Sequence, residues 1–542
     1  MPDLLITGFL VLVVSFFAYD LIDFSKLPYE DAAILMRYAE NFANGYGIVW
    51  NIGEEPVDGA TDFLFMIVVG LGVKAGLSVE GSAQMIGFIS HVLTVVAVYG
   101  ANRNLYKASV LVALISALYL AVGPGLLYVA AYFGTPLFAL SACVTWWLAL
   151  LLAKKGSSHK TSLLFAFVGL ITGLIRPEGV ILAVLMLLAI AYLNGLKQTY
   201  ITISYFIGVF VFAGGLYFLW RWQYFGSPLP NPFYVKGGGY LHFDSLKAST
   251  LNVIKLCLPF LPAYILALRS TRTLKIAISS LIPIVGFTLS FALLSDEMNF
   301  EARFQYAVLP IVLISWFPLV KNIHNDLRLL RWCDLGVRER STLTVLVIIL
   351  SIGVILYPYE RSHDVTFFPD GRYEAALILA EHSDEGYTIA TSEAGLLPLY
   401  SHWRAIDTYG LNDQWIAHNG EITTQYLDRY KPEVIMFTRE PHPEGATLAD
   451  KNETLERYVE DNGYILAAVF GDRVFGDVEN PAQPFDLYDP NAQGHYYYVR
   501  SDFPDSEEII SSLGTIDYYV YTSGVKSINY ALVQSSHDDY YR

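Results

Sequence analysis

Long apolar runs fill the first two-thirds of the chain, and most are close to the length that crosses a bilayer as a helix. The first run lacks a basic leading segment and a small-residue cleavage site, so we interpret it as a retained span. The pattern predicts a polytopic α-helical membrane protein. Its eleven expected spans lie near residues 4–19, 83–100, 108–123, 136–153, 161–175, 178–194, 201–220, 250–268, 274–294, 304–320 and 342–358.

The run at 62–77 is apolar but short, and three glycines and Lys74 interrupt it. If it does not cross, the basic loops all fall on one side, which the positive-inside rule assigns to the cytoplasm. We therefore predict that 62–77 is a re-entrant or surface-lying helix and that residues 20–82 form a first outer loop. The basic residues concerned are Arg103, Lys107, Lys154, Lys155, Lys160, Lys197, Arg269, Arg272, Lys275, Arg328, Arg331, Arg338 and Arg340.

The last third of the chain differs in charge from the rest. Residues 359–542 hold 12 Lys and Arg against 32 Asp and Glu, whereas residues 1–358 hold 23 against 19. The acidic tail predicts a solvated domain outside the plasma membrane and excludes nucleic acid as a partner. We predict two domains, a membrane domain at 1–358 and an extracytoplasmic α/β domain at 359–542.

Short apolar runs in the tail alternate with a helical pattern at 446–463, which is typical of an α/β domain. We expect the tyrosine-rich end of the chain to form strands rather than a ligand stack. The predicted strand regions are 387–395, 404–410, 434–438, 464–471 and the segments around Tyr496–Tyr498 and Tyr518–Tyr521.

The three cysteines, Cys143, Cys257 and Cys333, fall in predicted spans or in a cytoplasmic loop. The outer domain is therefore expected to lack disulfides. The chain also lacks the Cys and His spacing of a metal site, a phosphate-binding glycine loop, a dinucleotide fingerprint and a nucleophile elbow. Motifs of soluble enzymes do not explain it.

The first outer loop carries unusual polar chemistry just after a span. The tract AAILMRYAENFANG predicts a helix that ends at Asn44-Gly45, with Glu30 and Asp31 at its start. These carboxylates place a candidate general base at the membrane surface. The alternative is an interfacial helix in which both acids only favour the positive N-terminal end.

Charged residues also stand at the outer ends of later spans, where ionisable groups are costly and usually functional. Arg176-Pro177-Glu178-Gly179 joins two short spans, and its simplest interpretation is a tight hairpin with a self-paired Arg and Glu. Two further outer loops run from Arg221 to Lys236 and from Asp296 to Phe304. Together these loops supply Arg176, Arg221, Lys236 and Arg303, the cations needed to bind a lipid phosphate beside a base.

The first-loop sequence EDAAILMRYAENFANGYGIVWNIGEEPVDGATDFL resembles the motif of the actinobacterial terminal β-(1→2) arabinofuranosyltransferases and their flagellar-motor-control relatives. The resemblance recurs at RPEG 176–179, at YFGSPLPNPFYVK 224–236, at Asp296 with Arg303-Phe304, and at SEAGLLPLYSHWRAIDTYGLNDQWIAH 392–418. It implies a GT-C-type glycosyltransferase that moves a sugar from a polyprenyl-phosphate donor to an acceptor glycan outside the membrane.

The chain departs from the family pattern at several positions. Glu30 replaces the first Asp of a pair, and Asp58 and Asp62 stand where the family shows Glu and Asn. The segment Tyr132-Phe133-Gly134-Thr135 lacks an acid that the family has before the fourth span. The transferred sugar is therefore expected to be arabinofuranose or a related one.

A lipid-linked sugar already has a phosphate leaving group, so the enzyme needs a carboxylate for the acceptor's proton and cations for the departing phosphate. We expect Asp31 to be the base, with Glu30 as its neighbour or substitute. No metal is required, although two adjacent acids could hold one divalent cation weakly. The expected phosphate ligands are Arg37, Arg176, Arg303, Lys236 and Arg221, and the expected acceptor or sugar ligands are Asp58, Asp62, Asp296 and His418.

Two alternatives remain from the sequence. One is a transporter or lipid flippase with a periplasmic cap, although transporters favour charges near the midplane and these charges gather at one face. The other is a non-catalytic membrane scaffold, which the intact Asp31 and RPEG motif disfavour.

Overall fold

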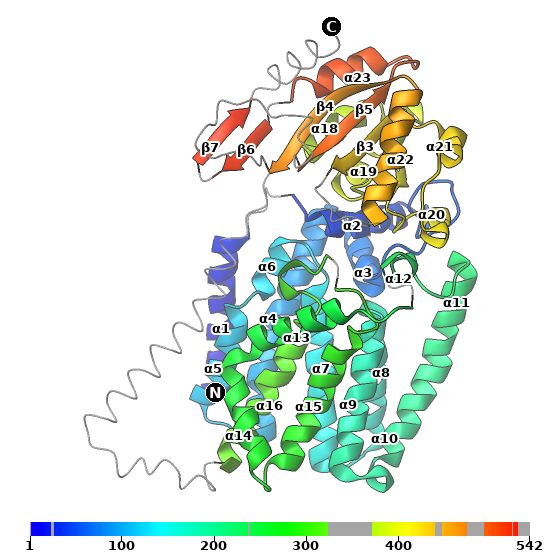
Figure 1. The fold of residues 1–542 in the computed structure, drawn as a ribbon. Helices are drawn as coiled ribbons and strands as arrows, with labels where there is room; N and C mark the ends of the chain where they lie inside the picture. The colour runs from blue at the N-terminus through cyan, green and yellow to red at the C-terminus, as the bar shows by residue number, and fades with distance from the viewer. Residues whose placement is uncertain are drawn as a thin grey trace. The chain divides into compact units, whose positions relative to one another are not determined.

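The computed structural model describes residues 2–22, 27–236, 239–296, 298–323, 371–439, 447–473, 493–516, 518–522 and 524–528 (Figure 1). The chain folds as two compact units. The helical unit comprises Met1–Lys26, Thr61–Pro228 and Lys236–Thr366, and the sheet unit comprises Leu27–Ala60, Leu229–Val235 and Phe367–Arg542. The predicted span at 342–358 and the predicted boundary at 358/359 lie outside the described residues.

Apolar helices build the helical unit, and among the described residues five helical segments are long enough to cross a membrane. These five are Val79–Tyr106, Val110–Ala130, Thr135–Lys155, Leu196–Phe225 and Phe243–Arg269. The prediction of a polytopic helical fold is confirmed, while the number of spans stays a prediction. The helices are α1 (Pro2–Leu21), α3 (Phe63–Lys74), α4 (Val79–Tyr106), α5 (Val110–Ala121), α6 (Gly125–Ala130), α7 (Thr135–Lys155), α8 (His159–Ile175), α9 (Glu178–Asn194), α10 (Leu196–Val209), η1 (Phe210–Gly214), α11 (Gly215–Phe225), α13 (Phe243–Cys257), η2 (Leu258–Phe260), α14 (Leu261–Arg269), α15 (Leu274–Ser290), η3 (Phe300–Ala302) and α16 (Val308–Ile323).

Local sequence sets where these helices begin and turn. Ser78, Ser109 and Ser158 cap the starts of α4, α5 and α8 by accepting a hydrogen bond from a backbone N–H of the first turn. Gly156 and Gly195 have φ values of +83° and +84°, which end α7 and α9 and allow sharp reversals. The spans therefore follow one another as antiparallel hairpins.

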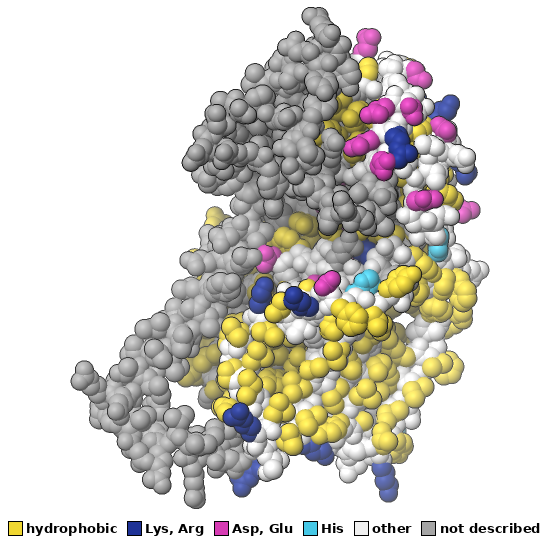
Figure 2. Space-filling model, in the orientation of Figure 1, with side chains coloured by type: hydrophobic (Ala, Val, Ile, Leu, Met, Phe, Trp, Pro, Cys, Tyr) yellow, Lys and Arg dark blue, Asp and Glu magenta, His cyan; other side chains and the backbone are white. Residues whose placement is uncertain are grey.

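The two ends of the helical unit differ in chemistry. At one end, Lys154 donates a hydrogen bond to the Leu105 carbonyl, and Ser157 bonds to Thr202 at 2.9 Å, which joins the basic turns. Figure 2 shows apolar side chains over the visible face of these helices and basic side chains near their ends. The RPEG turn lies at the opposite end, because α8 runs from the basic turn to Arg176. The assignment of the basic end to the cytoplasm stays a prediction.

The doubtful run at 62–77 forms α3, a helix of 12 residues. At 1.5 Å per residue it is about 18 Å long, shorter than the roughly 30 Å hydrocarbon core. It ends before Gly76, whose φ is +97°. A helix of this length cannot cross the hydrocarbon core alone. Its length therefore agrees with a re-entrant or surface-lying helix.

The sheet unit contains a five-stranded sheet with the order β2-β1-β3-β5-β4. β1 (Thr388–Thr391) pairs in parallel with β2 (Arg404–Asp407) and β3 (Val434–Arg439). β5 (Gln493–Arg500) runs antiparallel to both β3 and β4 (Tyr464–Arg473). A separate hairpin joins β6 (Tyr518–Thr522) to β7 (Gly524–Ile528).

Helices flank this sheet and complete an apolar core around Ile406, Ile435, Phe437, Leu455 and Tyr496. The predicted strands and the helix expected at 446–463 are confirmed, including the tyrosine-rich strands. The helices are α18 (Arg372–Ala380), η5 (Ser383–Glu385), α19 (Leu396–Ser401), α20 (Gln414–Asn419), α21 (Thr424–Tyr430), α22 (Thr447–Asp461) and α23 (Ser506–Leu513), with α12 (Asn231–Lys236) lying mainly in the same unit.

The predicted first outer loop is divided: residues 27–60 fold as part of the sheet unit, whereas residues 61–82 belong to the helical unit. Its helix α2 (Glu30–Ala43) ends at Asn44 and Gly45 as predicted, and nine of its residues are buried. α2 packs on α19, and the Trp50 indole donates a hydrogen bond to the Ala405 carbonyl at 2.9 Å. A simple interfacial helix would keep one face in solvent or lipid, whereas this helix is enclosed.

Candidate functional site

Arg176 sits at the end of α8 because the following proline stops the helix and forces an extended backbone at this residue. Its guanidinium forms ion pairs with Glu178 at 2.7 Å and with Asp62 at 3.0 Å. The pair with Glu178 is the one that the hairpin interpretation expects. The pair with Asp62 goes further, since it ties this turn to the start of α3.

Arg303 comes from a distant loop but reaches the same place. Its guanidinium lies 4.0 Å from the centre of the Phe133 ring and 5.0 Å from that of Phe304. The Arg176 guanidinium lies 4.8 Å from the same Phe304 ring. Both arginines are largely buried and share one aromatic ring, so two predicted phosphate ligands converge.

The loop that carries Arg303 is held in an uncommon conformation. Met298, Glu301 and Ala302 all have positive φ values, of 60°, 43° and 64°. Such residues are strained and gather at functional sites, where the surrounding structure holds them. The Tyr128 hydroxyl donates a hydrogen bond to the Glu301 carbonyl at 2.6 Å and anchors the strained turn.

Asp296 braces this loop instead of facing outward. Its carboxylate accepts hydrogen bonds from the side-chain amides of Asn299 at 2.8 Å and Gln305 at 2.9 Å. Burial raises the pKa of Asp296 above its ordinary value, although both amide bonds oppose the shift. These two bonds tie Asp296 to both sides of Arg303 in the sequence, and its predicted sugar contact stays a prediction.

Asp62 and Gly134 pack closely beside the arginines. A methyl group at Gly134 would come within 2.8 Å of the Asp62 carboxylate and of the Phe65 ring. Glycine is therefore required here for Asp62 to reach Arg176.

Arg221 and Lys236 are not shown to join this cluster. The Arg221 guanidinium donates to the Tyr217 hydroxyl at 2.9 Å and lies 5.7 Å from the Phe63 ring centre. Lys236 is half-buried at the end of α12. Their predicted role at the phosphate stays a prediction.

The candidate base belongs to the sheet unit. Asp31 is half-buried in the first turn of α2. Its neighbour Glu30 accepts hydrogen bonds from the Gly395 and Leu396 N–H groups and pairs with Arg372 at 3.1 Å. Glu30 therefore fastens α2 to α19, which favours Asp31 over Glu30 for proton transfer.

The contacts of Arg37 are hydrogen bonds that hold the fold together. Its guanidinium donates to the carbonyls of Trp50 at 2.9 Å, Trp403 at 2.8 Å and Pro398, and to the Asn51 side chain at 3.1 Å. Burial lowers the pKa of Arg37 to about 10, so it stays protonated at neutral pH. These contacts give no support to the predicted phosphate role.

The last two predicted ligands also lie in the sheet unit. Asp58 is buried, and its backbone carbonyl accepts a hydrogen bond from the Asn231 N–H at 2.9 Å. His418 is exposed on α20, and its ring lies 4.3 Å from that of Tyr234. Their roles toward an acceptor stay predictions. Among the described residues, no three His, Cys, Asp or Glu side chains gather as metal ligands would.

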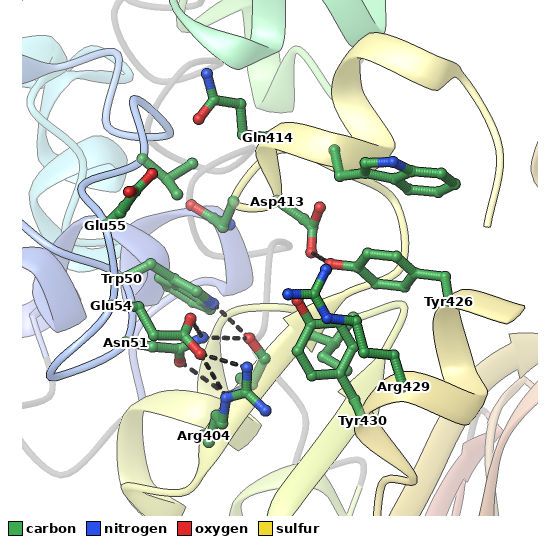
Figure 3. A pocket seen from close by; sticks show the side chains of 15 residues that line it. Trp50, Asn51, Glu54, Glu55, Arg404, Asp413, Gln414, Tyr426, Arg429 and Tyr430 are labelled. Carbon is green, nitrogen blue, oxygen red and sulfur yellow. Dashed lines mark hydrogen bonds and ion pairs between the residues drawn. The ribbon is translucent and has the colours of Figure 1, made fainter. Parts of the chain in front are cut away.

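The sheet unit contains a polar pocket that the sequence did not predict (Figure 3). Aromatic, acidic, amide and basic side chains line it. Trp415 of α20 precedes Tyr426 of α21 by 11 positions, so no local motif marked this pair. The pocket is lined by Trp50, Asn51, Glu54, Glu55, Val57, Arg404, Ala405, Ile406, Asn412, Asp413, Gln414, Trp415, Tyr426, Arg429 and Tyr430.

Solved structures share this fold. The chain superposes on ArnT from Cupriavidus metallidurans bound to undecaprenyl phosphate with a TM-score of 0.56 and 14% identity, covering 91% of this chain and 98% of that one. The apo state of ArnT gives a TM-score of 0.54 with the same identity and coverage. The oligosaccharyltransferase of Archaeoglobus fulgidus gives 0.52 at 10% identity, covering 80% of this chain and 69% of that one.

These likenesses show the fold. It is a GT-C-like membrane fold with a C-terminal sheet domain, as the sequence predicted. Residues 363–497 match a domain of unknown function, DUF8728. In sequence, no curated protein matches the chain.

Proposed function

We propose that this protein is a membrane glycosyltransferase that takes its sugar from a polyprenyl-phosphate donor. The acceptor is a glycan or glycoconjugate outside the plasma membrane, and the sugar is arabinofuranose or a related one. The observation that carries the proposal is the convergence of Arg176 and Arg303 on Phe304. Two guanidinium groups at one aromatic ring suit the oxygens of a single phosphate.

The two arginines have different parts in this proposal. Arg176 is already paired with Asp62 and Glu178, so a phosphate must compete with two carboxylates for it. The faces of Phe133 and Phe304 fix the plane of the Arg303 guanidinium. Because this orientation is fixed, we assign the main phosphate contact to Arg303 and a supporting one to Arg176.

The reaction needs one proton transfer and one bond exchange. Asp31 takes the proton of the acceptor hydroxyl while the oxygen of that hydroxyl attacks the anomeric carbon of the donor sugar. The bond from that carbon to the phosphate oxygen breaks, and the leaving phosphate carries the electron pair. Positive charge from Arg303 and Arg176 stabilises the phosphate as its charge grows.

The test is transfer from membrane polyprenyl-phosphate arabinose by the purified chain and its variants. Asp31→Asn should lower transfer by about 10²–10⁴-fold, the usual contribution of a general base, with unchanged thermal stability. The control is Arg457→Ala, because Arg457 is 66% exposed on α22 and pairs with Glu453 there. Asp31→Asn activity above about a tenth of wild type would move the base role to Glu30.

A second comparison addresses the donor. Arg303→Ala should raise the KM for the lipid donor more than the KM for the acceptor, and Arg303→Lys should restore part of the loss through its point charge. Equal effects on both substrates would indicate a folding defect and contradict the phosphate assignment. Absence of any transfer by wild type, together with movement of the intact lipid across vesicles, would favour the flippase alternative.

A further inference from the structure

The pocket of the sheet unit has the composition of a ligand site rather than a packing defect. Its volume is about 300 Å³, near the lower end for small-molecule sites. It lies between the first outer loop, which supplies Trp50 to Val57, and the segment from Arg404 to Tyr430. Both segments belong to one compact unit, so the pocket is a built feature of that unit.

One wall of the pocket offers an aromatic platform. The Trp415 ring stacks on the Tyr426 ring with centroids 4.7 Å apart and planes within 16°. Trp415 is nevertheless 40% exposed, so one face of the indole is covered and much of the rest meets solvent. An exposed indole supported from behind is rigid and suits the C–H face of a sugar ring.

The polar residues of the pocket pair with one another. Glu54 accepts hydrogen bonds from the Arg404 guanidinium and from the Asn51 amide, the latter at 2.9 Å. Asp413 accepts from the Tyr426 hydroxyl at 2.6 Å, opposite this group (Figure 3). The pocket therefore presents donors and acceptors together around its rim.

The charges favour a neutral ligand. Two guanidinium groups, Arg404 and Arg429, face three carboxyl groups from Glu54, Glu55 and Asp413. A phosphate or an acidic peptide would meet carboxylates, and a cationic ligand would meet guanidinium groups. A neutral polyol can accept from one set and donate to the other.

We propose that this pocket binds a neutral saccharide, with a sugar ring on Trp415 and its hydroxyl groups between Arg404, Asp413 and Arg429. The pocket holds the end or a short stretch of a glycan. That this glycan is the acceptor rests on the proposed function, whereas the binding itself does not. Saccharide binding would therefore persist in a chain that cannot transfer sugar.

The experiment uses the purified full chain in detergent on an array of soluble oligosaccharides, with neutral pentose, neutral hexose, N-acetylhexosamine, uronic-acid and phosphorylated members, alongside acidic and basic peptides. At least one neutral class should be retained. Trp415→Ala should weaken that binding by about tenfold, equivalent to about 1.4 kcal/mol. Trp415→Phe, which keeps a ring, should lose less.

The matched control is Trp222→Ala, because Trp222 is a similarly exposed indole of α11 in the helical unit, at 47%. Asp31→Asn should bind like wild type even though its transfer is lost, which separates this inference from the proposed function. Three results would overturn the inference: no retention of any saccharide, retention of acidic ligands or peptides in preference to neutral sugars, or equal binding by Trp415→Ala with an unchanged melting temperature.

Discussion

Replacing Arg37 by methionine should damage folding rather than donor binding. Arg37 is 7% exposed, and its guanidinium donates to three backbone carbonyls and one side-chain oxygen, which join α2 to Trp50-Asn51 and to the segment around α19. Methionine fills a similar volume but donates nothing. The change therefore leaves buried acceptors without their donor.

Each buried acceptor left in this way costs about 1–3 kcal/mol, and hydrogen bonds from a charged donor lie in the upper part of that range. The three carbonyls alone then give a loss of about 3–5 kcal/mol, allowing for relaxation and non-additivity. Arg37 also lies 4.7 Å from the Trp50 ring centre, a contact that the variant loses as well. A loss of this size is a large part of the stability of an ordinary domain.

The assay is thermal unfolding of the purified full chain at one fixed scan rate. At about 2–4 °C per kcal/mol for a unit of this size, Arg37→Met should lower the melting temperature of the sheet unit by about 6–20 °C. Arg37→Lys should fall between, because an ammonium group replaces only part of the bonds. Arg457→Met, at an exposed site on α22, should change it little.

One outcome would contradict this structural role of Arg37. If Arg37→Met melts like wild type and selectively loses use of the lipid donor, the burial argument is refuted. The phosphate role predicted from the sequence would then be restored to Arg37.

Three further outcomes are expected. Gly134→Ala should lower the transfer rate and reduce the free energy of unfolding by about 1–3 kcal/mol, because the new methyl group displaces Asp62. Activity and thermal unfolding measure the two effects, and a variant unchanged in both would contradict the close packing at Gly134. Burial raises the pKa of Asp413, so the folded state binds the carboxyl proton more tightly than the unfolded state does. The protonated carboxyl therefore favours folding at low pH, and this contribution to stability is lost as the pH rises through the raised pKa. The melting deficit of Asp413→Asn should therefore be smaller at pH 7 than near pH 4, and a deficit that grows with pH would reverse the sign. Cysteines introduced at Asn44 and Gly494 should react with an impermeant reagent in intact cells, and protection of either would contradict the outer placement of the sheet unit.

The sequence predicted most of the secondary structure because hydrophobic periodicity is local. The apolar runs became helices, and runs such as VIMFT became strands at the expected residues. The end of α2 followed from Asn44-Gly45, since glycine there takes a φ of +88°. Patterns of this kind depend on neighbours in the chain, so they can be read without a structure.

The roles of single charged residues were harder to predict because they depend on distant partners. Arg37 resembles a phosphate ligand in the sequence, yet its partners include carbonyls that lie 361 and 366 positions away. Arg303 and Arg176 could be grouped only by their shared place at span ends, and the ring of Phe304 that joins them was not anticipated. The pocket of the sheet unit was missed for the same reason, since its two walls come from segments far apart in the chain.

The sheet unit combines residues 27–60 with residues 367–542, so it cannot fold until most of the chain has been translated. Glu30 binds the backbone at Gly395, 365 residues later. At about 5–20 residues per second, the ribosome needs roughly 20–70 seconds to make the partner that encloses α2. During that interval the apolar side chains of α2 have no sheet unit to pack against. We expect a chaperone or the membrane surface to cover them until the segment around Gly395 has been made.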